Sequence, residues 1–358
     1  MKNKNHISKL RIKLYQEKLE RLKRKSASKK RLQNIANNKR VSSIRETKHK
    51  NESLFNQPKE ATVSSKSDFT LLDFPENVLS FIKMVDEVTK KKKYKTIFFD
   101  ISQVTSIDIG SIGLLLSKIN ELSTVGIKVK GNFPENAPCK KIICESGFLS
   151  HMNDMKGRRF NYLRGESNLM VSRGFDRTSN VLVGSAIRKA VKHLTGVDES
   201  YRPLYSLAQE MCANSVEHAN EHHHSKNWLF SVTYKNADTV CFTMTDIGRG
   251  ILGTLKRKAS QIIKEVLLSD DKDILGRAFD KQYTSKTKDI NRNKGLPKIK
   301  SIADNNFINN FVVITNNVLL DFSNNNNSKL LNKKFDGTFY YWELNKKCIE
   351  TWKIRKSQ

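Results

Sequence analysis

The apolar positions between residues 68 and 150 change period several times, which indicates alternating strands and helices. Short apolar runs typical of strands occur at 69–72, 96–100 and 126–130. Apolar positions three or four residues apart, typical of helices, occur at 76–90, 111–123 and 138–146, with Ile112, Leu115, Leu116 and Ile119 facing inward. We expect the run 96–100 to be buried on both faces of a sheet that carries these helices.

The second half of the chain shows the same two periods. A helix is expected to begin near Thr178 as its N-cap and to end near Leu194. Its expected core face comprises Val181, Leu182, Ile187, Val191 and Leu194. Residues 227–234 and 240–246 predict a hairpin, and residues 311–320 and 339–344 predict two further strands. The pattern therefore predicts an α/β sandwich with helices on one face of a mixed sheet.

One expected helix, within residues 204–219, carries polar side chains at every fourth position. Glu210, Asn214 and His218 therefore share one face. Such a face is costly to bury unless a polar ligand fills it. Carboxylate and amide oxygens are ligands that Mg²⁺ prefers, together with substrate phosphates. The alternative at this stage is a polar stripe that faces solvent.

Two later segments carry charged residues and glycines at the ends of predicted elements. A buried strand at 240–245 leads into Asp246, followed by Gly248 and Gly250, where the backbone can approach a ligand closely. Lys294 and Gly295 stand at the start of a short helix that includes residues 299–304. A glycine with flanking lysines at a helix start is suited to binding phosphate.

Taken in order, these segments resemble the GHKL ATPases, the superfamily of gyrase, Hsp90, MutL and the histidine kinases. Glu210, Asn214 and His218 match the N box, and Asp246-x-Gly248-x-Gly250 matches the G1 box. The remaining matches are Phe279 with Thr284-Ser285-Lys286, then Gly295-Leu296 of the G2 box, and Gly337-Thr338-Phe339. The resemblance covers roughly residues 175–345 and implies ATP and Mg²⁺ as ligands.

The resemblance also assigns roles to single residues. Asn214 would coordinate Mg²⁺, Asp246 would accept the adenine amino group with Thr338 nearby, and Glu210 would be the general base. Gly248, Gly250 and Gly295 would let the backbone approach the base and the phosphates. Lys286, Lys294 and Lys298 are suited to phosphate contacts by charge. The G2 box departs from the family because Pro297 removes one backbone N–H. Nucleotide binding is therefore better supported than fast turnover.

The stretch 99–114 resembles a STAS domain, the fold of the anti-sigma antagonists. Members carry an acceptor hydroxyl directly after the aspartate, but here Ile109 follows Asp108. Isoleucine cannot accept phosphate, so we expect the segment to dock a partner or to dimerise. One alternative is that Ser111 serves as a displaced phosphate acceptor, and another is that the segment is an α/β unit unrelated to STAS domains.

Charge is concentrated at the N-terminus of this 358-residue chain, whose net charge is +29. Residues 1–60 hold 19 Lys and Arg against 5 Asp and Glu, an excess of 14 positive charges. The spacing of Ile12, Tyr15, Leu19 and Leu22 predicts a helix near residues 6–34. Residues 35–66 are rich in Asn, Ser and Lys, which indicates a linker. Such an arm suits a polyanion, so residues 1–50 are a candidate nucleic-acid-binding segment; a solvated tail is the alternative.

Other features narrow the class of protein. The five cysteines show no metal-type pairing and predict reduced thiols in a cytoplasmic protein. No apolar run reaches about 18 residues, so we expect no membrane span.

The histidines outside the N box do not indicate a metal site or a phosphoacceptor. His222, His223 and His224 do not share a helix face and predict a solvated turn. His151 and His193 do not lie in the helical hairpin that carries the phosphoacceptor of a histidine kinase.

We therefore predict four regions: a basic arm and linker at 1–66, a STAS-like domain at 67–150, a connector at 151–176 and a GHKL ATPase domain at 177–358. The predicted function is that of an ATP-binding regulatory protein, with a partner or a second copy bound through the STAS-like domain. Enzymatic activity, as an ATPase or a protein serine kinase, stays open. The alternatives are a nucleic-acid-associated ATP-gated dimer and a non-catalytic ATP-binding protein.

Overall fold

The computed structural model describes residues 60–160, 169–172, 177–218, 228–259, 270–280 and 295–358. The chain divides after Pro58, and all described residues belong to the second unit, Lys59–Gln358. The predicted basic arm and its helix at 6–34 lie outside the described residues. Among the described helices, none has both the length and the apolar character needed to cross a bilayer.

The first part of the second unit is built on a parallel sheet with the order β1-β3-β5. Its strands are β1 (Glu60–Ser64), β3 (Thr96–Asp100) and β5 (Lys128–Gly131), and β2 (Asp68–Phe69) pairs separately with β4 (Ser106–Ile107). The helices of this part are α2 (Pro75–Lys90), α3 (Ile109–Thr124), α4 (Ala137–Glu145) and the 3₁₀ turn η2 (Phe148–His151). The predicted alternation of strand and helix is confirmed here.

Two details of this sheet differ from expectation. β1 lies within the segment predicted as linker; only Val63 of its five residues is buried, so no apolar alternation marks it. β3 buries Ile97 and Phe99 but leaves Phe98 partly exposed. The strand is therefore buried on one face rather than on both.

The second part is an antiparallel sheet with the order β6-β7-β8-β10-β9. Its strands are β6 (Leu169–Ser172), β7 (Trp228–Tyr234), β8 (Thr239–Ile247), β9 (Asn309–Asp321) and β10 (Lys329–Asn345). Its helical segments are α5 (Arg177–Thr195), α6 (Arg202–His218), α7 (Gly250–Ala259), α9 (Asp271–Phe279), α10 (Gly295–Asp304), α11 (Lys346–Ser357) and the 3₁₀ turn η3 (Asn325–Asn327). The predicted hairpin is the β7–β8 pair.

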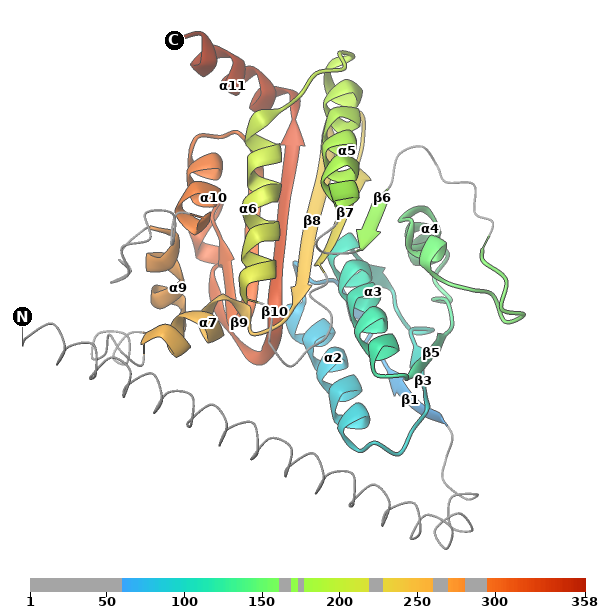
Figure 1. Cartoon of the computed structure of the whole chain (residues 1–358). Coiled ribbons are helices and arrows are strands. Elements are labelled where there is room, and N and C mark those ends of the chain that lie inside the picture. The colour runs from blue at the N-terminus through green and yellow to red at the C-terminus, as the bar shows by residue number, and fades with distance from the viewer. Residues whose placement is uncertain (1–59, 161–168, 173–176, 219–227, 260–269, 281–294) are drawn as a thin grey trace, which may run out of the picture. The chain divides into compact units, whose positions relative to one another are not determined.

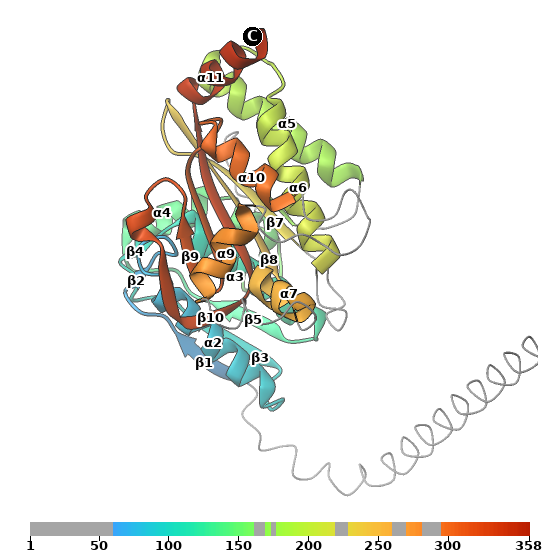
Figure 2. The same cartoon turned by 90° about the vertical axis from the view of Figure 1, so that its left-hand side faces the viewer.

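Alternate residues of this sheet enter two different cores, and helices cover both faces. Phe242 and Trp342 stack in the core beneath α5 and α6. Leu229, Phe339 and Tyr341 belong to the other core, which α2 and α3 complete by packing on β7, β8 and β10. Figures 1 and 2 show these two groups of helices on opposite sides of the antiparallel sheet. The described α-helices of residues 177–358 all contribute to the core on one face of this sheet, as predicted, and the other face is covered by α2 and α3 of the first part. The prediction of a mixed sheet is wrong, since every described pairing in it is antiparallel.

Other predictions about this part also need correction. Val181 is 69% exposed and Leu182 is 45% exposed, because the buried stripe of α5 runs through Val183, Ala186, Ile187, Ala190, Val191 and Leu194 instead. Thr178 lies inside α5 and is not its N-cap. β6 lies in the predicted connector, and α11 was not predicted. The Gly337-Thr338-Phe339 stretch lies within β10, not before the last strand.

A buried lysine joins α2 to α3. Lys118 is 4% exposed, and its ammonium forms ion pairs with Asp86 of α2 and, at 2.6 Å, with Glu121 of α3. Removing one partner of a buried ion pair leaves charge without compensation. We expect Lys118→Met to lower the free energy of unfolding by roughly 2–4 kcal/mol. Chemical denaturation should show this loss, whereas Lys83→Met, on the exposed face of α2, should change it little. Equal effects of the two substitutions would contradict the assigned role.

Candidate functional site

The predicted polar face of α6 meets the first residue of α10. A side chain at Gly295 would bring its Cβ to 3.2 Å from Asn214 Oδ1 and 3.2 Å from Glu210 Oε2. Both contacts are tighter than ordinary van der Waals distance, so glycine permits this approach of α10 to α6. Glu210, Asn214 and Gly295, predicted from separate motifs, therefore converge at the N-terminus of α10.

Glu210 also carries an ion pair with α10. Lys298 Nζ lies 2.7 Å from Glu210 Oε1, and the side chains of the two residues are 49% and 28% exposed respectively. Lys298 follows Gly295 by three residues, which places it one turn into the helix. A cation, a carboxylate, an amide and the N-terminal turn of a helix are thus gathered at one place.

Asp246 is buried near the end of β8, opposite Thr338 of β10. Its Oδ2 accepts a hydrogen bond from Ser215 Oγ at 2.8 Å, and its Oδ1 accepts one from the backbone N–H of Thr338 at 3.1 Å. Burial raises the pKa of Asp246 to about 6, although these two hydrogen bonds oppose the shift. The carboxylate is therefore costly to keep charged in the absence of a further donor.

Tyr340 connects Asp246 with Asn214. Burial raises the pKa of the Tyr340 hydroxyl well above its usual range, the charge of Asp246 adds to this, and a side-chain interaction with Asn214 opposes it. Asn214 Nδ2 is buried and makes no well-formed hydrogen bond in the described part of the chain. Asn214 of α6 and Asp246 of β8 thus lie on the same side of the antiparallel sheet, and the Asn214 Nδ2 is available to a further acceptor.

The turn after Asp246 is built around Gly250. Its φ is +70°, a left-handed conformation that favours glycine, and a Cβ there would lie 2.5 Å from Asn316 Oδ1 and 2.7 Å from Thr315 Oγ1. Thr315 Oγ1 accepts a hydrogen bond from Ile251 N–H, and the Gly248 N–H donates to the Asp336 carbonyl. The two predicted glycines therefore shape the turn at the end of β8.

Some residues named in the sequence analysis lie outside the described residues: the predicted site residues Thr284, Ser285, Lys286 and Lys294, and the predicted turn at His222 to His224. His218 is the last residue of α6, and its side chain is not described. Leu296 is the second residue of α10 and packs, partly buried, against the core beneath α6.

Other residues at this site were missed by the sequence analysis. Ser215 directly follows the predicted site residue Asn214, and Tyr340 follows Thr338 by two positions. Their closeness in sequence to predicted site residues is the signal that could have identified them. Thr315 and Asn316 lie in the middle of β9, where no pattern singles them out.

In the segment that resembles a STAS domain, Ser111 is buried and hydrogen-bonded to Asp108. Asp108 caps α3: its carboxylate accepts the Ser111 N–H at 2.7 Å, and Ser111 Oγ lies 3.3 Å from the Asp108 N–H. Asp108 also accepts the N–H groups of Leu71 and Leu72, and burial raises its pKa. Ser111 is 0% exposed, so its hydroxyl is closed to a phosphate donor in this conformation.

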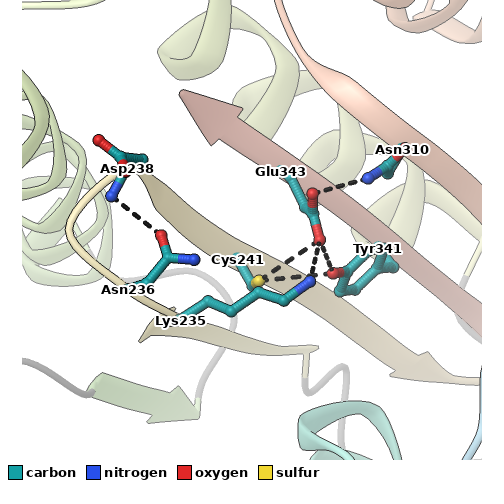
Figure 3. Close-up of polar contacts among 7 residues, drawn as sticks. All are labelled: Lys235, Asn236, Asp238, Cys241, Asn310, Tyr341 and Glu343. Atoms are coloured by element: carbon teal, nitrogen blue, oxygen red, sulfur yellow. Dashed lines mark hydrogen bonds and ion pairs between the residues drawn. The ribbon is translucent and has the colours of Figure 1, made fainter. Parts of the chain in front are cut away.

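A second polar cluster lies at the other end of the sheet (Figure 3). Glu343 accepts hydrogen bonds from Lys235, Asn310 and Tyr341. Burial raises the pKa of Glu343, but the hydrogen bonds and the charge of Lys235 outweigh it, and the pKa lies below its usual value. Cys241 completes the cluster, and the five cysteines of the chain are free thiols. Because Glu343 is saturated by protein donors, this cluster is structural.

Comparison with known proteins adds little to this geometry. No protein-family model matches the sequence. No curated protein matches it. A chain from a structure described as "The crystal structure of SiaB-SiaC complex from Pseudomonas aeruginosa" aligns with 53% of this chain and 96% of its own length, at 14% identity and a TM-score of 0.27. So low a TM-score carries no argument about function. The support for a function therefore comes from the α/β architecture, with its parallel and antiparallel sheets, and from the polar residues of α6, α10 and β8.

Proposed function

We propose that this chain is a regulatory protein that binds ATP with Mg²⁺ between α6, α10 and the end of β8, in the manner of the GHKL superfamily. The observation that carries the proposal is the convergence of Asn214, Asp246 and Gly295 on one side of the antiparallel sheet. In this proposal the adenine amino group donates to Asp246, and the phosphates lie at the N-terminus of α10.

The residues present fit a magnesium nucleotide. Asn214 offers an amide oxygen next to the Glu210 carboxylate, and Gly295 leaves the space that a Cβ would fill. Mg²⁺ prefers oxygen ligands of these kinds and keeps substrate phosphates in its shell. The Nδ2 of Asn214, which lacks a well-formed hydrogen bond to any described residue, is a further donor that a phosphate oxygen would satisfy. When bound, the ion would neutralise phosphate charge; Asn214 would orient it, and Glu210 would hold a water or a hydroxyl.

The α2–α3 part is proposed as a STAS-like docking module rather than as a phosphoacceptor. α3 packs against β7 and β8 on the face of the sheet opposite α6. Ser111 is therefore separated from Glu210 by the sheet, in addition to being buried. If the protein transfers phosphate, the acceptor hydroxyl belongs to a protein partner. A nucleic acid bound by residues 1–50 is the second proposal for a partner, supported by their positive charge.

Calorimetric titration with MgATP tests the binding. We expect Asn214→Ala to weaken MgATP binding by about tenfold, since it removes the amide oxygen proposed for the metal, and to reduce the dependence on Mg²⁺. Asn305→Ala, directly after the C-terminal end of α10 and away from the proposed site at its N-terminus, is the control and should bind like the unchanged protein. Absence of binding to the unchanged protein, or equal binding by both variants, would reject the proposed site.

A further inference from the structure

The Lys298–Glu210 ion pair lies at the first turn of α10, where the proposed function puts the phosphates of the nucleotide. Its lysine belongs to α10, one turn after Gly295, and its glutamate belongs to α6. The Glu210 carboxylate presents Oε1 to Lys298 and Oε2 toward the start of α10. An anion entering at the N-terminus of α10 would therefore meet Lys298 and Glu210 together.

We propose that Lys298 is the residue by which this site distinguishes a nucleoside triphosphate from a diphosphate, an inference that rests on the proposed ATP site. Without nucleotide, Lys298 neutralises Glu210. A terminal phosphate carries more negative charge than one carboxylate oxygen and competes for the same ammonium group. The lysine then turns to the phosphate, and the Glu210 carboxylate is released from its ion pair.

The physical basis is that Lys298 is half-exposed, with a long side chain, and is not locked in the core. Exchanging one partner for another within its reach requires no movement of α10. The carboxylate of Glu210 would repel a nearby phosphate if Lys298 did not balance its charge. A hydrogen bond to a charged group contributes about 1.5–3 kcal/mol, which corresponds to roughly ten- to hundredfold in affinity.

A second lysine on the same helix serves as the matched control. Lys300 lies two residues after Lys298 but pairs with Asp304 at 2.7 Å and with Asp280 at 3.5 Å. It has the same charge and stem as Lys298, yet it is held by other carboxylates. Any effect of helix propensity or net charge should therefore appear in both Lys298→Met and Lys300→Met.

The experiment measures the dissociation constants of Mg·ADP and of a non-hydrolysable Mg·ATP analogue for the full chain. We expect Lys298→Met to weaken the binding of the ATP analogue by about tenfold or more and the binding of ADP by less than about twofold. Lys300→Met should leave both constants unchanged, and Lys298→Arg should restore much of the preference because it keeps the charge.

A double-mutant cycle tests the exchange of partners. Glu210→Gln removes the carboxylate that competes for Lys298, so the ATP analogue should bind several-fold more tightly, by about 1 kcal/mol. This gain should be smaller when Glu210→Gln is combined with Lys298→Met, because only the repulsion between Glu210 and the phosphate is then relieved.

The outcomes separate this inference from the proposed function. Binding of both nucleotides with the same ATP-to-ADP ratio in Lys298→Met and the unchanged protein would overturn the inference and leave the nucleotide site standing. A gain from Glu210→Gln that is equally large with and without Lys298 would also overturn it. Failure of the unchanged protein to bind either nucleotide would overturn both.

Discussion

Asp246→Asn is expected to stabilise the nucleotide-free protein at alkaline pH while abolishing most of its affinity for ATP. The pKa of Asp246 is raised from 3.8 to about 6 because burial disfavours the charged carboxylate. A raised carboxyl pKa means that the folded state loses stability as pH rises from about 4 through 6, and that the cost is complete above this range. Two pKa units correspond to roughly 3 kcal/mol.

Asparagine fits the position without this cost. Its Oδ1 can accept the Thr338 N–H as the carboxylate does, and its Nδ2 can donate to Ser215, whose hydroxyl can donate to the Met211 carbonyl. We therefore expect Asp246→Asn to raise the free energy of unfolding by roughly 2–3 kcal/mol at pH 8 and by little at pH 4.5.

The same substitution should remove the acceptor proposed for adenine. Affinity for ATP should fall by about tenfold to a hundredfold, since a charge-assisted hydrogen bond is lost. Denaturation at pH 4.5 and 8, together with calorimetric titration, measures both effects. Asp336→Asn is the control, because that side chain is 69% exposed and should alter neither. A variant that is less stable than the unchanged protein at pH 8 would contradict the role of burial at Asp246.

Gly250→Ala is expected to be among the most destabilising single substitutions in the second unit. Besides its left-handed φ of +70°, Gly250 faces the Gly337 carbonyl, which a Cβ would approach to 2.8 Å, as well as the side chains of Thr315 and Asn316. The strain and the displaced hydrogen bonds should together cost roughly 3–4 kcal/mol. Nucleotide binding should weaken in parallel, because this turn follows Asp246.

Gly126 separates the two causes of this loss. Its φ is +76°, but no atom lies within 4 Å of a Cβ built there. Gly126→Ala should therefore cost only the backbone strain, about 1–2 kcal/mol. Comparing denaturation midpoints of the two variants measures the steric part. Equal losses would mean that the contacts at Gly250 relax without cost.

Local pattern was sufficient for elements that carry many apolar side chains of their own. α3 buries the predicted Ile112, Leu115 and Leu116, and β7 and β8 are buried over most of their lengths, so these elements could be predicted. β1 was missed because only Val63 of its five residues is buried, so it forms through pairing with β3 rather than through an apolar pattern, and β6 is a strand of only four residues that pairs with β7. Val181 and Leu182 were misassigned because periodicity alone does not say which of two apolar stripes meets the sheet.

The candidate site divides in the same way. The sequence by itself determined which residue types occur at helical or turn spacing: Glu210 with Asn214, Asp246 with its glycines, and Gly295 at a helix start. Only the tertiary structure decided that Gly295 meets Asn214, that Lys298 pairs with Glu210, 88 residues earlier in the chain, and that α3 lies behind the sheet. Spacing along the chain fixes directions within one element, whereas contacts between elements depend on how several buried faces pack together at once.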